Sequence, residues 1–355
     1  MPAPILAPIT HILPLTTIQR QRVLPVPGKI IVRKGQKVSA SDTLAEADLN
    51  PEHMLLDLGR GLGISDDAVD EVVQCRVGDL LAEGDIIAGP VGLARRVVRA
   101  PKRGRVMLIG SGQALLALQT TTYELKAGLS GQIVELISDR GAIVETVGAL
   151  IQGVWGNGLI DFGLMLVLAK NPDQILTSAQ LDVSMRGAVV LGGYLGDAET
   201  IQTAGDLPLR GLILGSMDPG LIPLAQKAPF PVIVIDGFGH RRMTPAAFRL
   251  LSTNERREVS LNAEPWDRYT GARPEVIIPL PATGDPPTPR TALIFRVDQT
   301  VRVNKAPYVG MIGKINSLEP GLQVFPSGLR TRAAEVSLEN GENVLLPIAN
   351  LEVID

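Results

Sequence analysis

The sequence predicts a multidomain, β-rich protein that includes one small α/β domain. The 355 residues exceed what one compact core of ordinary size contains, so the length favours roughly two to four domains. The 37 glycines and 27 prolines are spread along the whole chain, which fits many short strands joined by tight turns. Apolar residues alternate with a period of two over most of the chain, and strand and helix patterns alternate only in its middle.

Composition and charge narrow the classes of function. Hydrophobic residues make up 45% of the chain, which is enough for packed cores. The net charge is −3, so no overall field draws the protein toward nucleic acid or anionic lipid. The single cysteine, Cys75, is expected to be an inert buried thiol. The N-terminal segment makes a poor signal peptide, and no apolar run approaches the roughly 20 residues that span a bilayer, so we expect a cytoplasmic location.

Two glycine-punctuated segments dominate residues 23–124. They read GKIIVRKGQKVSASDTLAE and VRAPKRGRVMLIGSGQALL, and a short helix with Ser65 at its N-cap lies between them. The two segments resemble the halves of a barrel-sandwich hybrid, the fold of biotinyl and lipoyl carriers and of Rnf-type electron-transport subunits. This resemblance implies one such domain over 23–124, with a helical insertion at 50–75 and an N-terminal extension at 1–22. A carrier needs an exposed lysine between the halves, and the helix there contains none.

Residues 125–180 continue the β-rich pattern, and residues 181–275 change to an α/β pattern. Three strands, GAVVLGG, RGLILGS and FPVIVIDGFG, are followed by helices that begin near Asp197, Asp218 and Thr244. The glycine-containing loops after these strands meet at one edge of a parallel sheet, where helix N-termini favour an anion. The candidate anion- or ligand-binding residues are Gly193, Ser216, Gly239, His240 and Arg241. In the alternative interpretation, these glycines only end strands and the charged loop is simply solvated.

The rhythm of this α/β segment is also similar to the small swivelling or DRTGG-type regulatory domains. The literal DRTGG motif is absent, so the resemblance implies an architecture and no inherited nucleotide-related role.

The C-terminal part follows a proline-rich linker at 276–297. Residues 298–355 alternate strictly in several places, and Asn340-Gly341 is a strong hairpin signal, so we expect a small five-stranded barrel. The segments TVRVNKAPYVGMIGKI and AAEVSLENGENVLLPIANLEVI resemble a KOW-type SH3-like barrel. Such barrels bind RNA, DNA or protein, and the resemblance implies contacts from the cations and the ring near the first hairpin. The candidate residues for contact with nucleic acid or a partner are Arg302, Lys305, Tyr308 and Lys314.

No catalytic pattern emerges, so an enzymatic activity is unsupported. The three histidines lie in different segments without ligands at metal-binding spacing, and we predict neither a metal nor a cofactor. Three functions remain open. They are a non-catalytic scaffold that binds protein partners or copies of itself, a nucleic-acid-associated factor built on the C-terminal barrel, and an anion- or nucleotide-sensing regulatory protein. Low charge bias and an aromatic content of only 3% favour the first.

Overall fold

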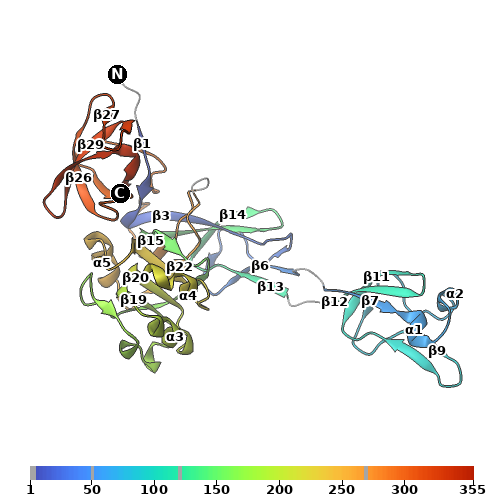
Figure 1. Ribbon diagram of the computed structural model, residues 1–355. Helices are drawn as coiled ribbons and strands as arrows, with labels where there is room; N and C mark the ends of the chain where they lie inside the picture. Colours follow the sequence, from blue (N-terminus) through green and yellow to red (C-terminus); the bar gives the residue numbers. More distant parts are fainter. Residues whose placement is uncertain (1–4, 49–51, 119–121, 268–270) are drawn as a thin grey trace.

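The computed structural model describes residues 5–48, 52–118, 122–267 and 271–355 (Figure 1). The protein is β-rich, with several separate sheets and only short helices, as the multidomain β-rich class predicted from the sequence requires. Within the described ranges, no helix has both the length and the apolar character needed to cross a membrane.

The largest sheet is mixed. The neighbouring strands β17, β19, β20 and β21 pair in parallel, as does the short β18 with β19, and the strands on both sides of this group are antiparallel. Its order is β16 (Trp155–Gly156), β21 (Val232–Phe238), β20 (Gly211–Met217), β19 (Ala188–Leu195), β17 (Ile160–Val167), β22 (Glu258–Asn262), β23 (Glu275–Pro279), β15 (Gly141–Gln152), β14 (Gly131–Ile137) and β5 (Lys37–Val38). Two further strands pair with it, β18 (Ile175–Leu176) beside β19 and β3 (Ile12–Val23) beside β15. Residues 276–279, which the sequence assigned to a linker, complete β23.

Helices cover both faces of the parallel part of this sheet. Helices α3 (Ala198–Asp206) and α4 (Ile222–Ala225) pack on one face, and α5 (Pro245–Ser252) packs on the other. Neighbouring residues of β19 show the alternation, because Val189 points into the α5 core and Val190 into the opposite one. All three predicted strand–helix units are present. Short 3-10 turns occupy Ser178–Gln180, Val183–Met185, Pro219–Leu221 and Ile348–Asn350.

Residues 52–118 form a module of their own, inserted between two strands that pair with each other (Figure 1). We call it the inserted module. Its core contains only its own residues, among them Cys75, which is buried as predicted. Burial raises the pKa of the Cys75 thiol. The elements of the module are β7 (His53–Asp57), α1 (Leu58–Leu62), α2 (Asp66–Val69), β8 (Leu80–Leu81), β9 (Ile86–Val91), β10 (Arg96–Arg99), β11 (Gly104–Gly110) and β12 (Gln113–Leu118).

The two segments that resemble hybrid halves do not pair with each other, a question that the resemblance left open. The first segment, 28–46, pairs with residues on the far side of the insertion, through β4 (Lys29–Ile30), β6 (Thr43–Asp48) and β13 (Thr122–Lys126), and through β5 with β14. The second segment, 98–116, pairs inside the inserted module, with β7 and β8.

A turn that occurs twice in the chain explains why the two similar segments need not pair with each other. Gly35 donates its backbone N–H to the Ile133 carbonyl at 2.7 Å, and Gly78, 43 positions later, donates to the Val106 carbonyl at 2.8 Å. The turns that follow also match, because Asp42 accepts from the Ser39 backbone N–H at 2.8 Å and Asp85 accepts from that of Ala82 at 2.7 Å. The chain therefore contains two units with the same turns, one nested in the other. The outer unit is built from residues 28–48 and 122–137, and the inner unit is the inserted module. Segment 98–116 pairs with strands of the inserted module, which are nearer in the sequence than residues 28–46, so this pairing closes a shorter loop.

The C-terminal sheet has six strands in the order β2, β31, β25, β26, β29 and β30. Among the described residues no strand pair joins its two edges, so the sheet is open, and the closed five-stranded barrel expected from the sequence is wrong. The N-terminal strand β2 (Ile9–Thr10) covers one edge by pairing in parallel with β31 (Leu351–Ile354). The predicted Asn340-Gly341 hairpin is confirmed. The remaining strands are β25 (Thr300–Val303), β26 (Ile312–Leu318), β29 (Ala333–Leu338) and β30 (Asn343–Pro347), with the pairs β1 (Leu6–Ala7) to β24 (Leu293–Ile294) and β27 (Gln323–Val324) to β28 (Arg330–Thr331).

Candidate functional site

The predicted anion site lies at the carboxyl ends of β19, β20 and β21, where two of its residues serve the fold. Ser216 is fully buried, and its hydroxyl donates to the Arg241 carbonyl at 2.8 Å and accepts from the Arg241 backbone N–H at 3.1 Å. A side chain at Gly193 would overlap the backbone of Gln174, so this glycine allows β18 to approach β19. Both residues therefore position backbone at this edge of the sheet.

The other three residues of the predicted anion site lie in the loop after β21. The His240 ring stacks on Tyr194 with 4.5 Å between the ring centres. Gly239 has a φ of +83°, a left-handed conformation that suits glycine. The Arg241 guanidinium donates to the Phe238 carbonyl at 2.9 Å and to the Val309 carbonyl of the C-terminal sheet. Arg241 thus joins the α/β part to the loop between β25 and β26.

The four predicted contact residues of the C-terminal sheet do not form one surface patch. Arg302 is only 1% exposed and pairs with Asp236 of β21 at 2.7 Å, so it is not available for a surface contact. Tyr308 is half-buried against the core of the sheet, as the alternative to a stacking role would require. Lys305 and Lys314 are exposed.

A cleft that sequence analysis did not identify lies on the face of the central sheet opposite α5. Its volume is about 770 Å³. Its floor is a row of three polar side chains, Gln152 on β15, Glu275 on β23 and Asn262 on β22, which are cross-strand partners in register. They are 8%, 3% and 7% exposed, respectively. The next residues along these strands, such as Ile151 and Val276, point into the α5 core, which fixes the polar row on the opposite face.

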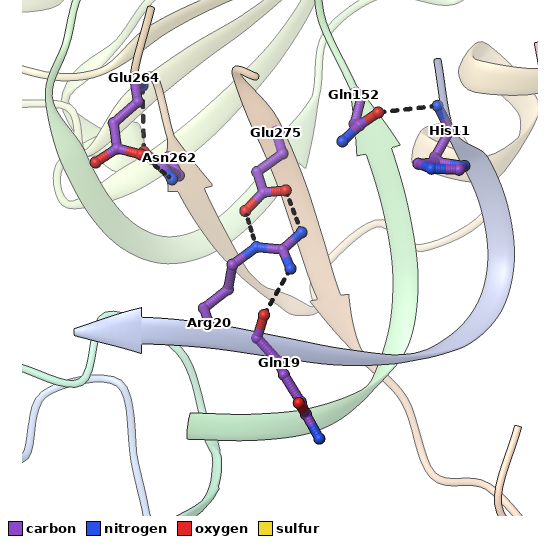
Figure 2. A network of polar contacts seen from close by, with 7 residues as sticks. All are labelled: His11, Gln19, Arg20, Gln152, Asn262, Glu264 and Glu275. Carbon is purple, nitrogen blue, oxygen red and sulfur yellow. Dashed lines mark hydrogen bonds and ion pairs between the residues drawn. The ribbon is translucent and has the colours of Figure 1, made fainter. Parts of the chain in front are cut away.

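The buried charges of the cleft are paired within the protein. Arg20 reaches from β3 to Glu275, with both carboxylate oxygens at 2.5 Å from guanidinium nitrogens (Figure 2). Burial alone would lower the pKa of Arg20, but the hydrogen bonds and charge of Glu275 outweigh it and the pKa is raised. Arg273 likewise pairs with Glu352 at 2.5 Å. Neither arginine is left as an unpaired cation.

Hydrogen bonds within the protein satisfy only some of the uncharged polar groups of the cleft. The His11 backbone N–H donates to Oε1 of Gln152 at 3.1 Å (Figure 2). Nε2 of Gln152 has no hydrogen-bond partner among the residues described. Nδ2 of Asn262 donates to the Glu264 carboxylate at 3.1 Å. The His11 ring is buried, and burial lowers its pKa, so the imidazole is neutral at pH 7. Trp266 at the rim is 56% exposed, with the Arg273 guanidinium 5.1 Å from its ring centre.

This arrangement is suited to binding a polar ligand, since it offers amide, carboxylate and indole groups side by side. No group of three histidine, cysteine or acidic residues in the described part of the chain is placed to hold a metal ion. The sequence signal for the cleft is weak. Gln152, Asn262 and Glu275 are single polar residues at strand ends in two different regions of the chain, and only the sheet brings them together.

The inserted module presents a second unusual surface. Leu55 on β7, Leu115 on β12 and Leu108 on β11 are cross-strand partners in register, and we call them the leucine row. Leu55 is 59% exposed and Leu108 is 63% exposed. Alternate residues, such as Ala114 and Leu116, fill the module core instead. The sequence signal is the run QALLAL in β12, which is apolar on both faces and therefore typical of a strand covered on both sides.

No protein-family model matches the chain, and no curated protein matches it either. The resemblances to barrel-sandwich hybrids, swivelling domains and KOW domains therefore stay predictions.

Proposed function

We propose that this protein is a non-catalytic binding protein that assembles through protein–protein contacts, and that the leucine row is a contact between two copies of the chain. The single observation that carries the proposal is the exposure of Leu55 and Leu108 in one continuous row. Contiguous exposed apolar surface marks interaction sites, because its removal from water stabilises a complex by about 25 cal/mol per Å².

A second copy fits this row because its borders are complementary in charge. Asp57 lies two residues beyond Leu55 on the same face of β7, while His53 lies two residues before it. Arg105 lies on the His53 side, since both pair with Ala117 of β12. A two-fold axis along the leucine row would place leucine on leucine and Asp57 of one copy opposite the basic border of the other. A two-fold interface must be self-complementary in this way.

The test is the solution mass measured by light scattering on a sizing column. We expect twice the 37.8 kDa of the chain for the wild type, and the single-chain mass for the Leu55→Asp/Leu108→Asp double variant. Leu93→Asp is the matched control, because Leu93 is fully exposed in the same module but lies outside the row. A wild-type monomer, or a dimer that survives the double variant, would contradict the proposal.

The same measurement separates the competing function, nucleic-acid association through the C-terminal sheet. Exposed Lys305 and Lys314 support this second candidate, while buried Arg302 weakens it. Nucleic-acid association predicts a raised 260/280 nm absorbance ratio that falls to the protein value at high salt, because phosphate contacts are salt-sensitive. A protein-like ratio at both salt concentrations supports assembly instead. The hydrogen bonds of Ser216 and Arg241 within the fold weigh against the third candidate, anion sensing.

We also propose the finer architecture. The matching turn hydrogen bonds of the two nested units support a relationship of each unit to barrel-sandwich hybrids, the fold predicted for 23–124. The three strand–helix units support a small α/β domain of the swivelling type within 181–275. The antiparallel strands within 298–355 support a relationship to KOW-type domains. A cytoplasmic location belongs to the same proposal.

A further inference from the structure

The floor of the cleft is polar at a place where the neighbouring part of the same sheet face is apolar. Gln152, Glu275 and Asn262 occupy a sheet face that elsewhere buries Leu150 and Ile277. The Gln152 side chain is largely buried, but its Nε2 is not one of the buried atoms without a partner, so this donor faces the open cleft and not the core. Nε2 of Gln152 finds no partner among the described residues, although Oε1 of the same amide is bonded. A donor placed in this way in a cleft is suited to an acceptor on a ligand.

The charges of the cleft favour an uncharged ligand. Arg20 uses both nitrogens of one edge on Glu275, and its Nη1 donates to the Gln19 carbonyl at 2.7 Å. Arg273 pairs with Glu352 at 2.5 Å. A phosphate-binding cleft instead leaves arginines free to hold the anion from two sides. Here the buried cations are neutralised, and the exposed lining charges, Glu264 and Arg290, are opposite in sign.

The remaining lining groups match a ligand rich in hydroxyl groups. A hydroxyl both donates and accepts, and it finds the donor of Gln152 and the acceptor oxygens of Glu264 in one cleft. The exposed indole of Trp266 offers a flat apolar surface to the C–H face of a ring. A volume of about 770 Å³ lies within the range of small-ligand sites. We propose that the cleft binds a neutral carbohydrate, of the size of a disaccharide, with Gln152 and Glu264 bonding its hydroxyls and Trp266 stacking on a ring.

The full chain is titrated with four neutral probes, maltose, cellobiose, lactose and N,N′-diacetylchitobiose, and binding is followed by calorimetry and by tryptophan fluorescence. We expect saturable binding of at least one probe. Trp266→Ala and Gln152→Ala should each weaken that binding about tenfold, which is the loss expected for one stacking or hydrogen-bonding contact. Gln226→Ala is the matched control, because Gln226 is exposed on the α/β part and does not line the cleft, so this variant should leave the affinity unchanged.

Three results would overturn the proposal. They are no saturation with any of the four sugars up to about 10 mM, affinities unchanged in Trp266→Ala, and tighter binding of pyrophosphate or ADP than of every sugar. Because Trp266 is largely exposed, its variant keeps the fold and decides the outcome even if Gln152→Ala lowers the melting temperature. The proposal is independent of the leucine row, since the two sites share no residue.

Discussion

Arg302 is the most deeply buried cation that joins two parts of the molecule. Its guanidinium lies 2.7 Å from Asp236, and the Asp236 carboxylate also accepts from the Thr244 backbone N–H at 2.6 Å. Removing one partner of a buried ion pair leaves an uncompensated charge, which costs about 3–5 kcal/mol. We therefore expect Asp236→Asn to lower the free energy of unfolding by about that amount, measured by urea denaturation. Asp173→Asn is the control, because Asp173 belongs to an exposed ion pair whose loss should cost less than about 1 kcal/mol. Equal effects of the two variants would show that the buried pair contributes nothing special.

His11 makes stability depend on pH in a predictable direction. Burial lowers its pKa, Asp355 opposes that shift, and Arg273 and Arg20 reinforce it. The unfolded chain therefore binds the proton first, so stability is full above pH 6.5, the usual value, and declines as the pH falls toward the lowered pKa. We expect His11→Gln to flatten this decline. Thermal unfolding of both proteins between about pH 8 and pH 5 measures the difference, and identical slopes would rule out His11 as its source.

At the scale of single residues, the sequence predicted on which face of a strand a side chain lies, but not what covers that face. Val301 and Val303 fill the core of the C-terminal sheet, so alternation correctly placed Arg302 on the other face of β25. That face looks solvent-exposed from the sequence, but it is covered by the α/β part, as the Arg302–Asp236 pair shows. Sequence analysis missed the polar row of the cleft for a similar reason, because its members become neighbours only when strands β15, β23 and β22 pair.

At the scale of elements, the sequence correctly predicted where a helix begins, but it did not predict which distant strands pair. The cap before α3 is a clear case, since Asp197 accepts from the Thr200 backbone N–H at 2.8 Å within one turn of the helix. The pairing of Ile9 with Val353 joins the two ends of the chain, and no local pattern encodes it. The repeated turns of the two nested units made the pairing of strands ambiguous, because either first half offers the same hydrogen bonds.

Strands β14 and β15 approach each other so closely that one added methyl group between them should destabilise the protein. A Cβ at Gly131, where β14 begins, would overlap the carbonyl oxygen of Glu145. Gly131→Ala should therefore destabilise the protein by about 1–3 kcal/mol, as overpacking does. At Gly110, where β11 ends, nothing lies within 4 Å of the place that a Cβ would take, so Gly110→Ala should be neutral or slightly stabilising. Melting temperatures of the two variants are the measurement, and a tolerated Gly131→Ala would mean that β14 and β15 can separate without loss.

At the scale of the whole molecule, the inserted module is an independent unit placed within a hairpin. Its ends meet, because the Leu118 backbone N–H donates to the Glu52 carbonyl at 2.7 Å. The strands that receive it also meet, since Asp48 of β6 is the cross-strand partner of Thr122 of β13. Adjacent ends on both sides are the geometry in which domain insertion is tolerated. The module has its own core and spans residues 52–118, a length at which many domains fold alone.

This geometry predicts that the inserted module can be separated from the rest of the chain, which we call the body, and that each part keeps its own binding surface. Replacing residues 49–121 by Asn-Gly should restore a simple hairpin between β6 and β13 and leave the large sheet folded. Because the leucine row leaves with the module, the shortened chain should be monomeric, while isolated 52–118 should form the dimer. Because the cleft stays with the body, the shortened chain should keep the carbohydrate affinity of the full chain. Light-scattering masses and sugar titrations of the two pieces measure both properties at once. A shortened chain that still dimerises would move the assembly surface to the body, and one that loses sugar binding while keeping its melting transition would tie the cleft to the module.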